Sequence, residues 1–446
     1  MWLIDLVSVS KNEAFLKRVE FIKNEFSFES KTFADVDEFY DAEETLKRAK
    51  CILLDCIYRT PFEIAGLVQT CRHVADKSYI IVVTGSRLLE DEAKNIHKSG
   101  TSLIVTEEDF FNSSKVEFVT SQIVRTTFVP LKVKDLVAGT AIDFTVHHLL
   151  PQNKKFLKIA KPGTVVSQEF INKFSTINEL YVHRNEAEGL IEYTKTVSGS
   201  EEDSVLRACR AQFLKLKHGF TELVLLVSDQ TSAANFDAGK ALFEKINSYV
   251  IDLSNTLIKL DDPWTIINNS NIDDYGSLER GPAIAAYASV IASKLKHPNV
   301  RDVMLGALLS DIGILWLSPR TSSKIRKHAL EKLHAEEIME FHKHPIYSLN
   351  QCLSRKMPLS EEVKNAILQS HERADRQGFP HRPMPEKLSR SALIIRLSQE
   401  LDEKMQITIG EGRKTAQEVK KEFFAGILND TKGYPVSFIL DVMAVL

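Results

Sequence analysis

Cysteine, long apolar runs and net charge are all scarce in this chain of 446 residues. Its five cysteines are scattered, odd in number and without a Cys-x-x-Cys pair, which argues against a disulfide framework and against a zinc site built from thiolates. The longest apolar runs, such as LVLLV at 223–227, are far shorter than the roughly 20 residues that span a bilayer. These absences predict a reducing compartment and no membrane insertion.

The formal net charge is only −3, so there is no basic excess to hold a nucleic-acid polymer. The N-terminus, MWLIDLVSVSKNEAF, lacks the positive start and long apolar core of a signal peptide. We therefore expect a cytoplasmic protein. Its length exceeds what one hydrophobic core supports, so several domains are expected.

The first 125 residues alternate short apolar runs with segments of helical period. WLIDLV, CILLDC, YIIVVTG and SLIVT predict buried strands, because each is short, apolar and rich in β-branched residues. Strands that alternate with helices form parallel, doubly wound sheets. The pattern predicts an α/β domain at 1–125.

The rest of the chain divides into three further segments. Residues 126–198 combine strand-like pieces, turn pairs and a short helical pattern, which predicts a small α+β module. Residues 199–262 are amphipathic and predict a helical connector, which could form a homodimer or pack on its own bundle. Residues 263–446 predict an all-α bundle.

Three side chains with ligand chemistry recur on the apolar faces of that bundle. Asp311 follows Met304, Ala307 and Leu308 on one face of an expected helix over 300–317, and a buried carboxylate must be compensated. His371 continues the stripe of an expected helix over 361–373, and His344 precedes a proline at the end of a third helical element. Imidazole and carboxylate groups converging inside a bundle are suited to iron, manganese or zinc.

The order of these residues resembles the HD-GYP family of metal-dependent phosphohydrolases over about 265–446. The likeness rests on Asp311-Ile312-Gly313, His344-Pro345, His371-Glu372 with Asp375, and Gly378-Phe379-Pro380. It implies an HD-type bundle that hydrolyses cyclic di-GMP at a two- or three-metal centre. It also implies a recognition loop of Glu372, Asp375, Gly378, Phe379 and Pro380.

The chain departs from the family pattern at most metal-binding positions. Where the resemblance calls for ligands or a phosphate-binding lysine, this sequence has the residues Arg280, Ser310, Ile314, Ser370 and Gln399. Asp311, His344 and His371 remain, enough for one weakly held ion, and Arg280 is expected to pair with Asp311. The departures predict a degenerate domain without a cofactor; if the domain is active, the resemblance implies iron or manganese.

The first domain resembles a response-regulator receiver, with Asp55 ending the third expected strand and Thr84-Gly85 ending the fourth. In that family the aspartate is phosphorylated beside Mg²⁺ held by an acidic pair. Here Ser8 and Ser10 stand near the places of the carboxylates, so Asp55 and Thr84 are expected to be vestigial. The resemblance implies a receiver-shaped interaction domain.

Two functions remain open on the sequence. The first is a bacterial signal-transduction scaffold or sensor in cyclic di-GMP signalling, which binds proteins such as diguanylate cyclase domains through the loop around Phe379 and has possible residual binding of cyclic di-GMP. The second is a divergent cyclic di-GMP phosphodiesterase with a reduced metal site. The ligand count and Ile314 favour the scaffold, so the prediction leans against an enzyme.

Overall fold

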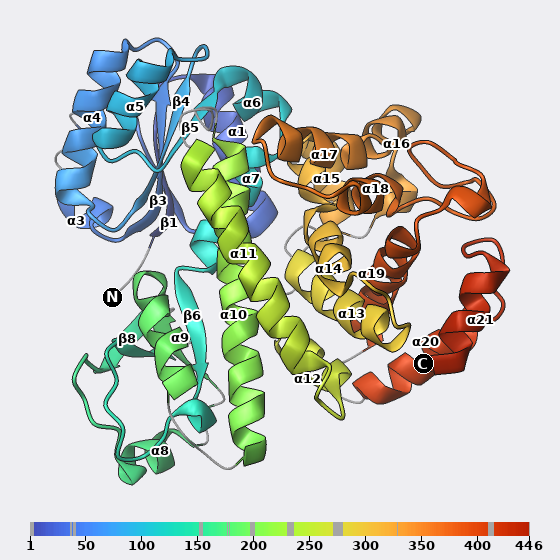
Figure 1. The fold of residues 1–446 in the computed structure, drawn as a ribbon. Coiled ribbons are helices and arrows are strands. Elements are labelled where there is room, and N and C mark those ends of the chain that lie inside the picture. The colour runs from blue at the N-terminus through green and yellow to red at the C-terminus, as the bar shows by residue number, and fades with distance from the viewer. Residues whose placement is uncertain are drawn as a thin grey trace. The chain divides into compact units, whose positions relative to one another are not determined.

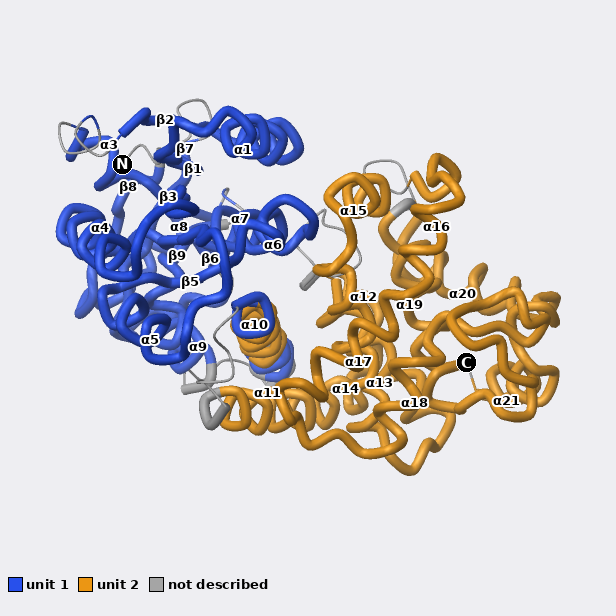
Figure 2. The backbone as a smooth tube through the Cα atoms, turned by 90° about the horizontal axis from the view of Figure 1, so that it is seen from above, with its two compact units in different colours: residues 1–211, 225–235 blue, residues 212–224, 236–446 orange. Residues whose placement is uncertain are grey.

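The computed structural model describes residues 4–35, 38, 42–150, 155–175, 177, 179–196, 201–229, 236–270, 280–327, 329–408 and 414–445. The ribbon in Figure 1 places sheets in the first half of the chain and helices in the second. The chain forms two compact units (Figure 2): unit 1 comprises residues 1–211 and 225–235, and unit 2 comprises residues 212–224 and 236–446.

Unit 1 opens with a five-stranded parallel sheet in the order β2-β1-β3-β4-β5. Its strands are β1 (Ile4–Val9), β2 (Ser30–Phe33), β3 (Ala49–Cys56), β4 (Tyr79–Thr84) and β5 (Leu103–Thr106). Helices α3 (Glu43–Leu46), α4 (Pro61–Val74) and α5 (Glu90–Lys98) cover one face, and α1 (Glu13–Phe26), α6 (Glu107–Asn112) and α7 (Lys115–Arg125) cover the other (Figure 1). The predicted α/β parallel-sheet domain is confirmed.

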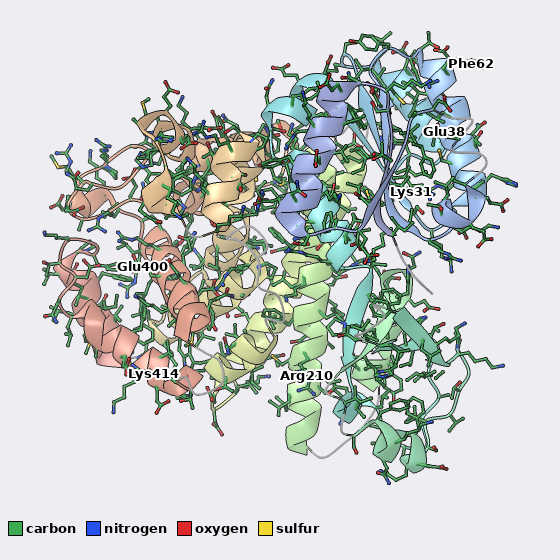
Figure 3. All side chains as sticks on the ribbon, turned by 180° about the vertical axis from the view of Figure 1, so that it is seen from behind. Lys31, Glu38, Phe62, Arg210, Glu400 and Lys414 are labelled. Carbon is green, nitrogen blue, oxygen red and sulfur yellow. The ribbon has the colours of Figure 1, made fainter. Side chains whose placement is uncertain are left out.

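The central strands of this sheet are apolar on both faces because helices cover both sides. Leu53 and Leu54, adjacent on β3, are both fully buried, one in each of the two cores that flank the sheet. Helix α4 starts where Thr60 caps it and Pro61 takes the first turn. Figure 3 shows the next residue, Phe62, at the outer edge of this domain.

A second, four-stranded sheet follows in unit 1, with the antiparallel order β6-β9-β7-β8. Its elements are β6 (Phe128–Lys132), η1 (Val133–Asp135), β7 (Val146–Leu150), β8 (Lys155–Ala160), α8 (Gln168–Phe174), β9 (Glu179–His183), η3 (Arg184–Glu186) and α9 (Ala187–Thr196). Val129, Leu180 and Val182 alternate into its core with Val146. This part has the mixed α and β content that the sequence predicts.

The segment predicted as a helical connector, 199–262, is divided between the units. Helix α10 (Glu201–Ser228) contributes to both, whereas α11 (Phe236–Leu257) lies in unit 2. The apolar face of α11, with Ile246, Val250, Leu253 and Leu257 buried, packs against α13 and α14 of the same chain. The structure thus adds α11 to the bundle.

The regular elements among the described residues of unit 2 are all helices, as expected for the bundle. Its further elements are α12 (Pro263–Ser270), α13 (Gly281–Lys294), α14 (Val300–Leu309), η4 (Ile312–Trp316), α15 (Pro319–Arg326), η5 (Leu330–Lys332), α16 (Ala335–Phe341), α17 (His344–Ser354), α18 (Glu361–Gln369), η6 (Pro385–Lys387), α19 (Arg390–Thr408), α20 (Ala416–Ile427) and α21 (Val436–Val445). None of the helices in the described ranges is long and apolar enough to cross a bilayer.

Candidate metal centre

Asp311 lies just beyond the end of α14, at the first residue before η4. A Cβ atom on Gly313 would lie 1.9 Å from the carbonyl oxygen of His344, so only glycine permits this approach of η4 to α17. The Ser348 hydroxyl joins the same two elements, because it accepts from the Gly313 amide at 2.7 Å and donates to the carbonyl of Ser310 at 2.6 Å. This junction holds Asp311 beside His344.

His371 does not lie on a helix, contrary to the sequence prediction of a helix over 361–373. Helix α18 ends at Gln369, and His371 follows in a turn. Gly378 folds back onto that turn, where an added Cβ would lie 2.5 Å from the carbonyl oxygen of His371. The prediction extended the helix because Val363 and Ile367 continue to His371 with helical spacing, but the loop after the helix sets the imidazole position.

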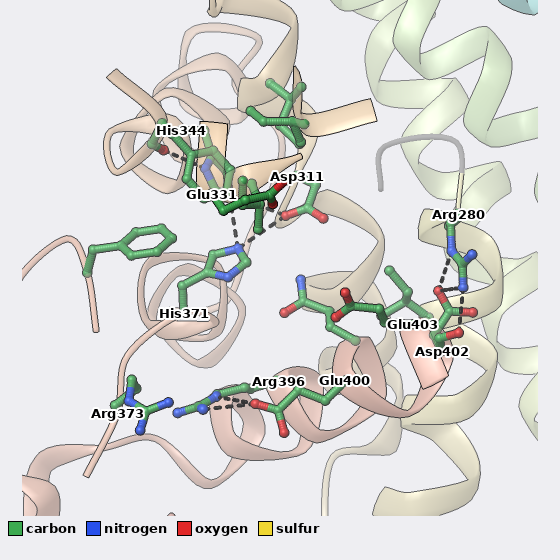
Figure 4. A pocket seen from close by; sticks show the side chains of 17 residues that line it. Arg280, Asp311, Glu331, His344, His371, Arg373, Arg396, Glu400, Asp402 and Glu403 are labelled. Carbon is green, nitrogen blue, oxygen red and sulfur yellow. Dashed lines mark hydrogen bonds and ion pairs between the residues drawn. The ribbon is translucent and has the colours of Figure 1, made fainter. Parts of the chain in front are cut away.

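The structure brings the three predicted ligands together (Figure 4). Nε2 of His371 lies 3.0 Å from Nε2 of His344 and 3.3 Å from Oδ1 of Asp311, and the third side of the triangle is 3.4 Å. Ligand atoms about 2.1 Å from one ion and separated by right to tetrahedral angles lie about 3.0–3.4 Å apart. The triangle therefore fits one metal ion, with further coordination positions open.

The protonation states of these groups suit a metal ligand set. Nδ1 of His344 is 2.7 Å from the carbonyl oxygen of Phe341, so it donates there and Nε2 is left to bind. Burial lowers the pKa of His371 below its usual value, which favours the neutral imidazole. Burial alone would raise the pKa of Asp311, but the bonds from His344 and His371 hold it well below its usual range.

Phe379 forms part of the wall around the triangle. Its ring stacks on His371 at 4.9 Å between centroids and on His342 at 4.2 Å. Two imidazoles stack on this ring, which is still partly exposed, so contact of Phe379 with a protein partner stays a prediction. His342 lies outside the ligand triangle.

The other residues of the predicted recognition loop order the backbone. Glu372 is fully buried and accepts from the amides of His381 and Arg382, the latter at 2.9 Å. Asp375 pairs with Arg373 at 3.0 Å. Gly378 makes the close approach described above, and Pro380 follows Phe379 through a cis peptide bond. None of these four residues belongs to the ligand triangle.

The segment Gly433-Tyr434-Pro435 supports this loop from behind, a role that the sequence did not reveal. The amide of Ala374 donates to the carbonyl of Gly433 at 3.2 Å, and Nη1 of Arg396 bonds the carbonyls of both Gly433 and Glu372. The fully buried Tyr434 donates its hydroxyl to Glu400 at 2.7 Å. A buried tyrosine needs such an acceptor.

The sequence predicted that Arg280 pairs with Asp311. In the structure Arg280 instead forms a buried ion pair with Asp402. Nη2 of Arg280 also donates to the carbonyl oxygen of Asp402 at 2.8 Å. Asp402 escaped notice in the sequence because charged neighbours flank it in QELDEK. Asp311 is compensated instead by the two histidines.

Three of the substituted positions lie near the ligand triangle. The Ser310 hydroxyl donates to the carbonyl of Ala307, and Gln399 reaches Ser310 at 3.4 Å. Ile314 is buried in the wall of the pocket. These groups form a polar and apolar lining that adds no metal ligand to the three residues of the triangle.

The triangle opens into a pocket of about 630 Å³ (Figure 4). The charged residues lining it are Arg280, Asp311, Glu331, Arg373, Arg396, Glu400, Asp402 and Glu403. Each arginine is held by a carboxylate: Arg280 by Asp402, Arg373 by Asp375 and Arg396 by Glu400. No ion-pair partner lies near Glu331 or Glu403 among the described residues, so the uncommitted charges of this pocket are negative.

Asp55 and Thr84 lie at the carboxyl ends of neighbouring strands β3 and β4. Asp55 accepts a hydrogen bond of 2.6 Å from the Ser10 hydroxyl, and its other oxygen accepts from the amide of Ile57 at 3.3 Å. The hydroxyl of Thr84 donates to Ser86 and Val105 carbonyls. The Ser10 hydroxyl thus bonds Asp55 at the place where the receiver resemblance calls for a carboxylate and Mg²⁺.

Comparison with known sequences identifies the class of the helical unit. Residues 253–421 match the sequence model of the HD domain, so the chain contains an HD domain there. No curated protein matches the chain. Among solved structures it is similar to Bd1817, a HDG"Y"P protein from Bdellovibrio bacteriovorus, with 15% identity and a TM-score of 0.44 over 71% of this chain and 98% of that chain.

Proposed function

We propose that this is a signal-transduction protein whose HD domain is a degenerate HD-GYP domain, a non-catalytic scaffold or sensor in cyclic di-GMP signalling. The HD domain match and the order of Asp311, His344 and His371 support the family. The parallel-sheet domain at the N-terminus supports a regulatory input, with Asp55 a vestigial phosphoacceptor. The protein acts through contacts with other proteins, diguanylate cyclase domains among them.

The observation that carries this proposal is that the site offers three protein ligands, which is enough for one metal ion and too few for two. A two-metal hydrolase positions both the attacking and the leaving oxygen between its ions. Here the ion would be held by Asp311, His344 and His371, and it would supply Lewis-acid polarisation of a bound group. The guanidinium of Arg280, fixed by its buried ion pair with Asp402, lies across the pocket from the two histidines of the triangle (Figure 4).

The charges of the pocket also favour a sensor over a phosphodiesterase. Hydrolysis of an anionic diester needs free cationic donors at the phosphate. The three arginines already neutralise carboxylates, and Ile314 supplies no charge. With Glu331 and Glu403 added, the pocket is better suited to a metal cation than to a cyclic dinucleotide.

A divergent mononuclear phosphodiesterase is the second candidate, and the open triangle of ligands favours it. The test is cyclic di-GMP turnover by the full chain loaded with iron or manganese, with His371→Ala as the matched variant. The scaffold proposal expects no linear product above that of the variant. Turnover that disappears with His371 would establish the phosphodiesterase instead.

A further inference from the structure

The three most exposed large hydrophobic side chains of the described residues gather at one edge of the N-terminal sheet. Tyr58 and Phe62 are each 88% exposed and Leu89 is 72% exposed. Tyr58 and Phe62 belong to the loop after β3 and the first turn of α4, whereas Leu89 ends the loop after β4. An apolar cluster of this kind indicates a contact surface.

The two loops are neighbours in space. Strands β3 and β4 pair through Cys56 and Thr84, where both loops begin. A Cβ atom on Gly85 would lie 2.4 Å from the carbonyl oxygen of Ile57, so the loops touch there. Helices α4 and α5, into which they lead, pack against one another. The exposed side chains therefore form one surface, which we name the β3–β4 edge.

Each loop carries the same order of side chains, first an arginine, then an apolar residue, then a glutamate. The first loop has Arg59, Phe62 and Glu63, and all three are exposed. Within the described chain, Arg59 has no ion-pair partner. The Glu63 carboxylate accepts from the amide and hydroxyl of Thr60, and it keeps its negative charge.

The second loop repeats this order with Arg87, Leu89 and Glu90. Arg87 is exposed, and none of the described carboxylates pairs with it. Glu90 pairs with Lys94 at 2.7 Å, one helical turn away and in solvent, which costs little to exchange for another partner. Both loops run from the sheet to the helix layer, so in both the arginine lies nearer the strand end and the glutamate lies in the first turn of the helix.

We propose that the β3–β4 edge is a homodimer interface between two copies of this chain. The two-fold axis lies in the plane of the interface and runs perpendicular to both loops. Each loop then faces the same loop of the partner subunit, and the two run antiparallel. Arg59 then faces Glu63 of the partner subunit and Arg87 faces Glu90 of the partner subunit. Phe62 and Leu89 lie between these charges, and Tyr58 extends the contact beyond Arg59. Such self-complementarity is what a two-fold contact requires.

The size of this surface fits a weak, reversible dimer. Aromatic side chains bury about 150–250 Å² each, and a standard interface buries about 800 Å² per partner. Tyr58 and Phe62 supply roughly half of that area, with Leu89 and the charged rim around them. This proposal does not depend on the metal site or on the role proposed for the HD domain.

The test is the dimer dissociation constant of the full chain, measured by sedimentation velocity from low to high micromolar concentration. The double variant Tyr58→Ser/Phe62→Ser is expected to raise Kd at least about tenfold, because central aromatic residues dominate interfaces. Leu440→Ser, at a side chain 63% exposed in α21, is the matched control and leaves Kd unchanged. A monomer at all concentrations, or a dimer insensitive to the double variant, would overturn the proposal.

Charge reversal tests the two-fold arrangement itself. Arg87→Glu and Glu90→Arg are each expected to raise Kd about tenfold. Each change puts like charges opposite one another, and the two-fold symmetry repeats that repulsive contact in both subunits. The combined variant reverses the order of charge on the loop, so it restores attraction and returns Kd to within about threefold of the wild type. Additive weakening in the combined variant would contradict the antiparallel pairing. Unchanged circular dichroism confirms that each variant is folded.

Discussion

Nε2 of His344 lies 3.0 Å from Nε2 of His371, although the two residues are 27 positions apart in the chain. Nδ1 of His344 contacts the carbonyl oxygen of Phe341, so in the neutral imidazole Nδ1 carries the proton and Nε2 carries the lone pair. Nε2 of His371 must then donate to it, or both nitrogens must bind one cation. Asp311 completes a triangle that suits the second arrangement.

We predict one metal ion per chain after incubation with iron or manganese, measured by plasma mass spectrometry. His371→Ala removes one of three ligands and is expected to lose that ion, whereas the exposed His381→Ala retains it. Two tightly held ions, or one ion that survives loss of His371, would contradict the three-ligand site.

Removing the Phe379 ring should weaken metal binding without removing a ligand. The ring stacks on His371 and fixes its orientation, and loss of such support costs about 10–100-fold in metal affinity. Phe379→Ala is therefore expected to raise the metal Kd, whereas Phe379→Tyr keeps the stack and leaves it unchanged. A competitive titration with a chelating dye measures both; equal affinities for Phe379→Ala and wild type would exclude this role.

Breaking the Arg280–Asp402 pair should destabilise the helical unit strongly. Asp402→Asn leaves a buried guanidinium without its counter-charge, which costs about 3–5 kcal/mol of unfolding free energy. The double variant Arg280→Met/Asp402→Leu removes both charges and is expected to recover most of that loss. Urea denaturation followed by circular dichroism gives the two values, and additive losses would show that the residues are not coupled.

Docking of the end of α10 on the first sheet should depend on pH. Burial by itself lowers the pKa of His97, but the hydrogen bond and charge of Asp229 raise it above its usual value. A histidine with a raised folded pKa stabilises below its unfolded pKa of about 6.5, and this contribution is lost as pH rises through the folded value.

The amide of Ile104 on β5 reports this contact, because it donates to Oδ2 of Asp229 at 3.4 Å. Its hydrogen-exchange protection, corrected for the intrinsic rate, is expected to fall between pH 6 and pH 8.5. His97→Gln should give low protection at both values. Equal protection of the wild type across this range would refute the coupling.

Asp55 is expected to stay unphosphorylated in acetyl phosphate and Mg²⁺. Its Oδ2 is bonded to the Ser10 hydroxyl, and a neutral hydroxyl lacks the negative charge with which an acidic pair holds the metal for phosphoryl transfer. Intact-protein mass spectrometry gives the answer directly. One phosphate per chain in the wild type and none in Asp55→Asn would show that Asp55 is phosphorylated and contradict this prediction.

The sequence alone predicted the parallel sheet and the three side chains that meet in the triangle, for identifiable physical reasons. Leu53 and Leu54 are both buried on β3, and apolar runs without alternation reveal strands covered on both faces. Asp311 and His371 were singled out because each lies on the apolar face of an expected helix, where a buried polar group needs a partner. The residues of the edge strand β2 were not predicted, since SKTF is short and half exposed and carries no such signal; only the receiver resemblance, which places Asp55 on a third strand, implied a strand there.

Only the tertiary structure decided which charges meet and which way the rings face. Arg280 pairs with Asp402, 122 positions away, and not with Asp311, which lies beside His344 at the start of α17 and His371 in the turn after α18. The β3–β4 edge and the support of the 372–375 loop by the carbonyl of Gly433 likewise depend on neighbours that are distant in sequence. Local patterns show that a polar group must be satisfied, but the packing of separate elements determines its partner.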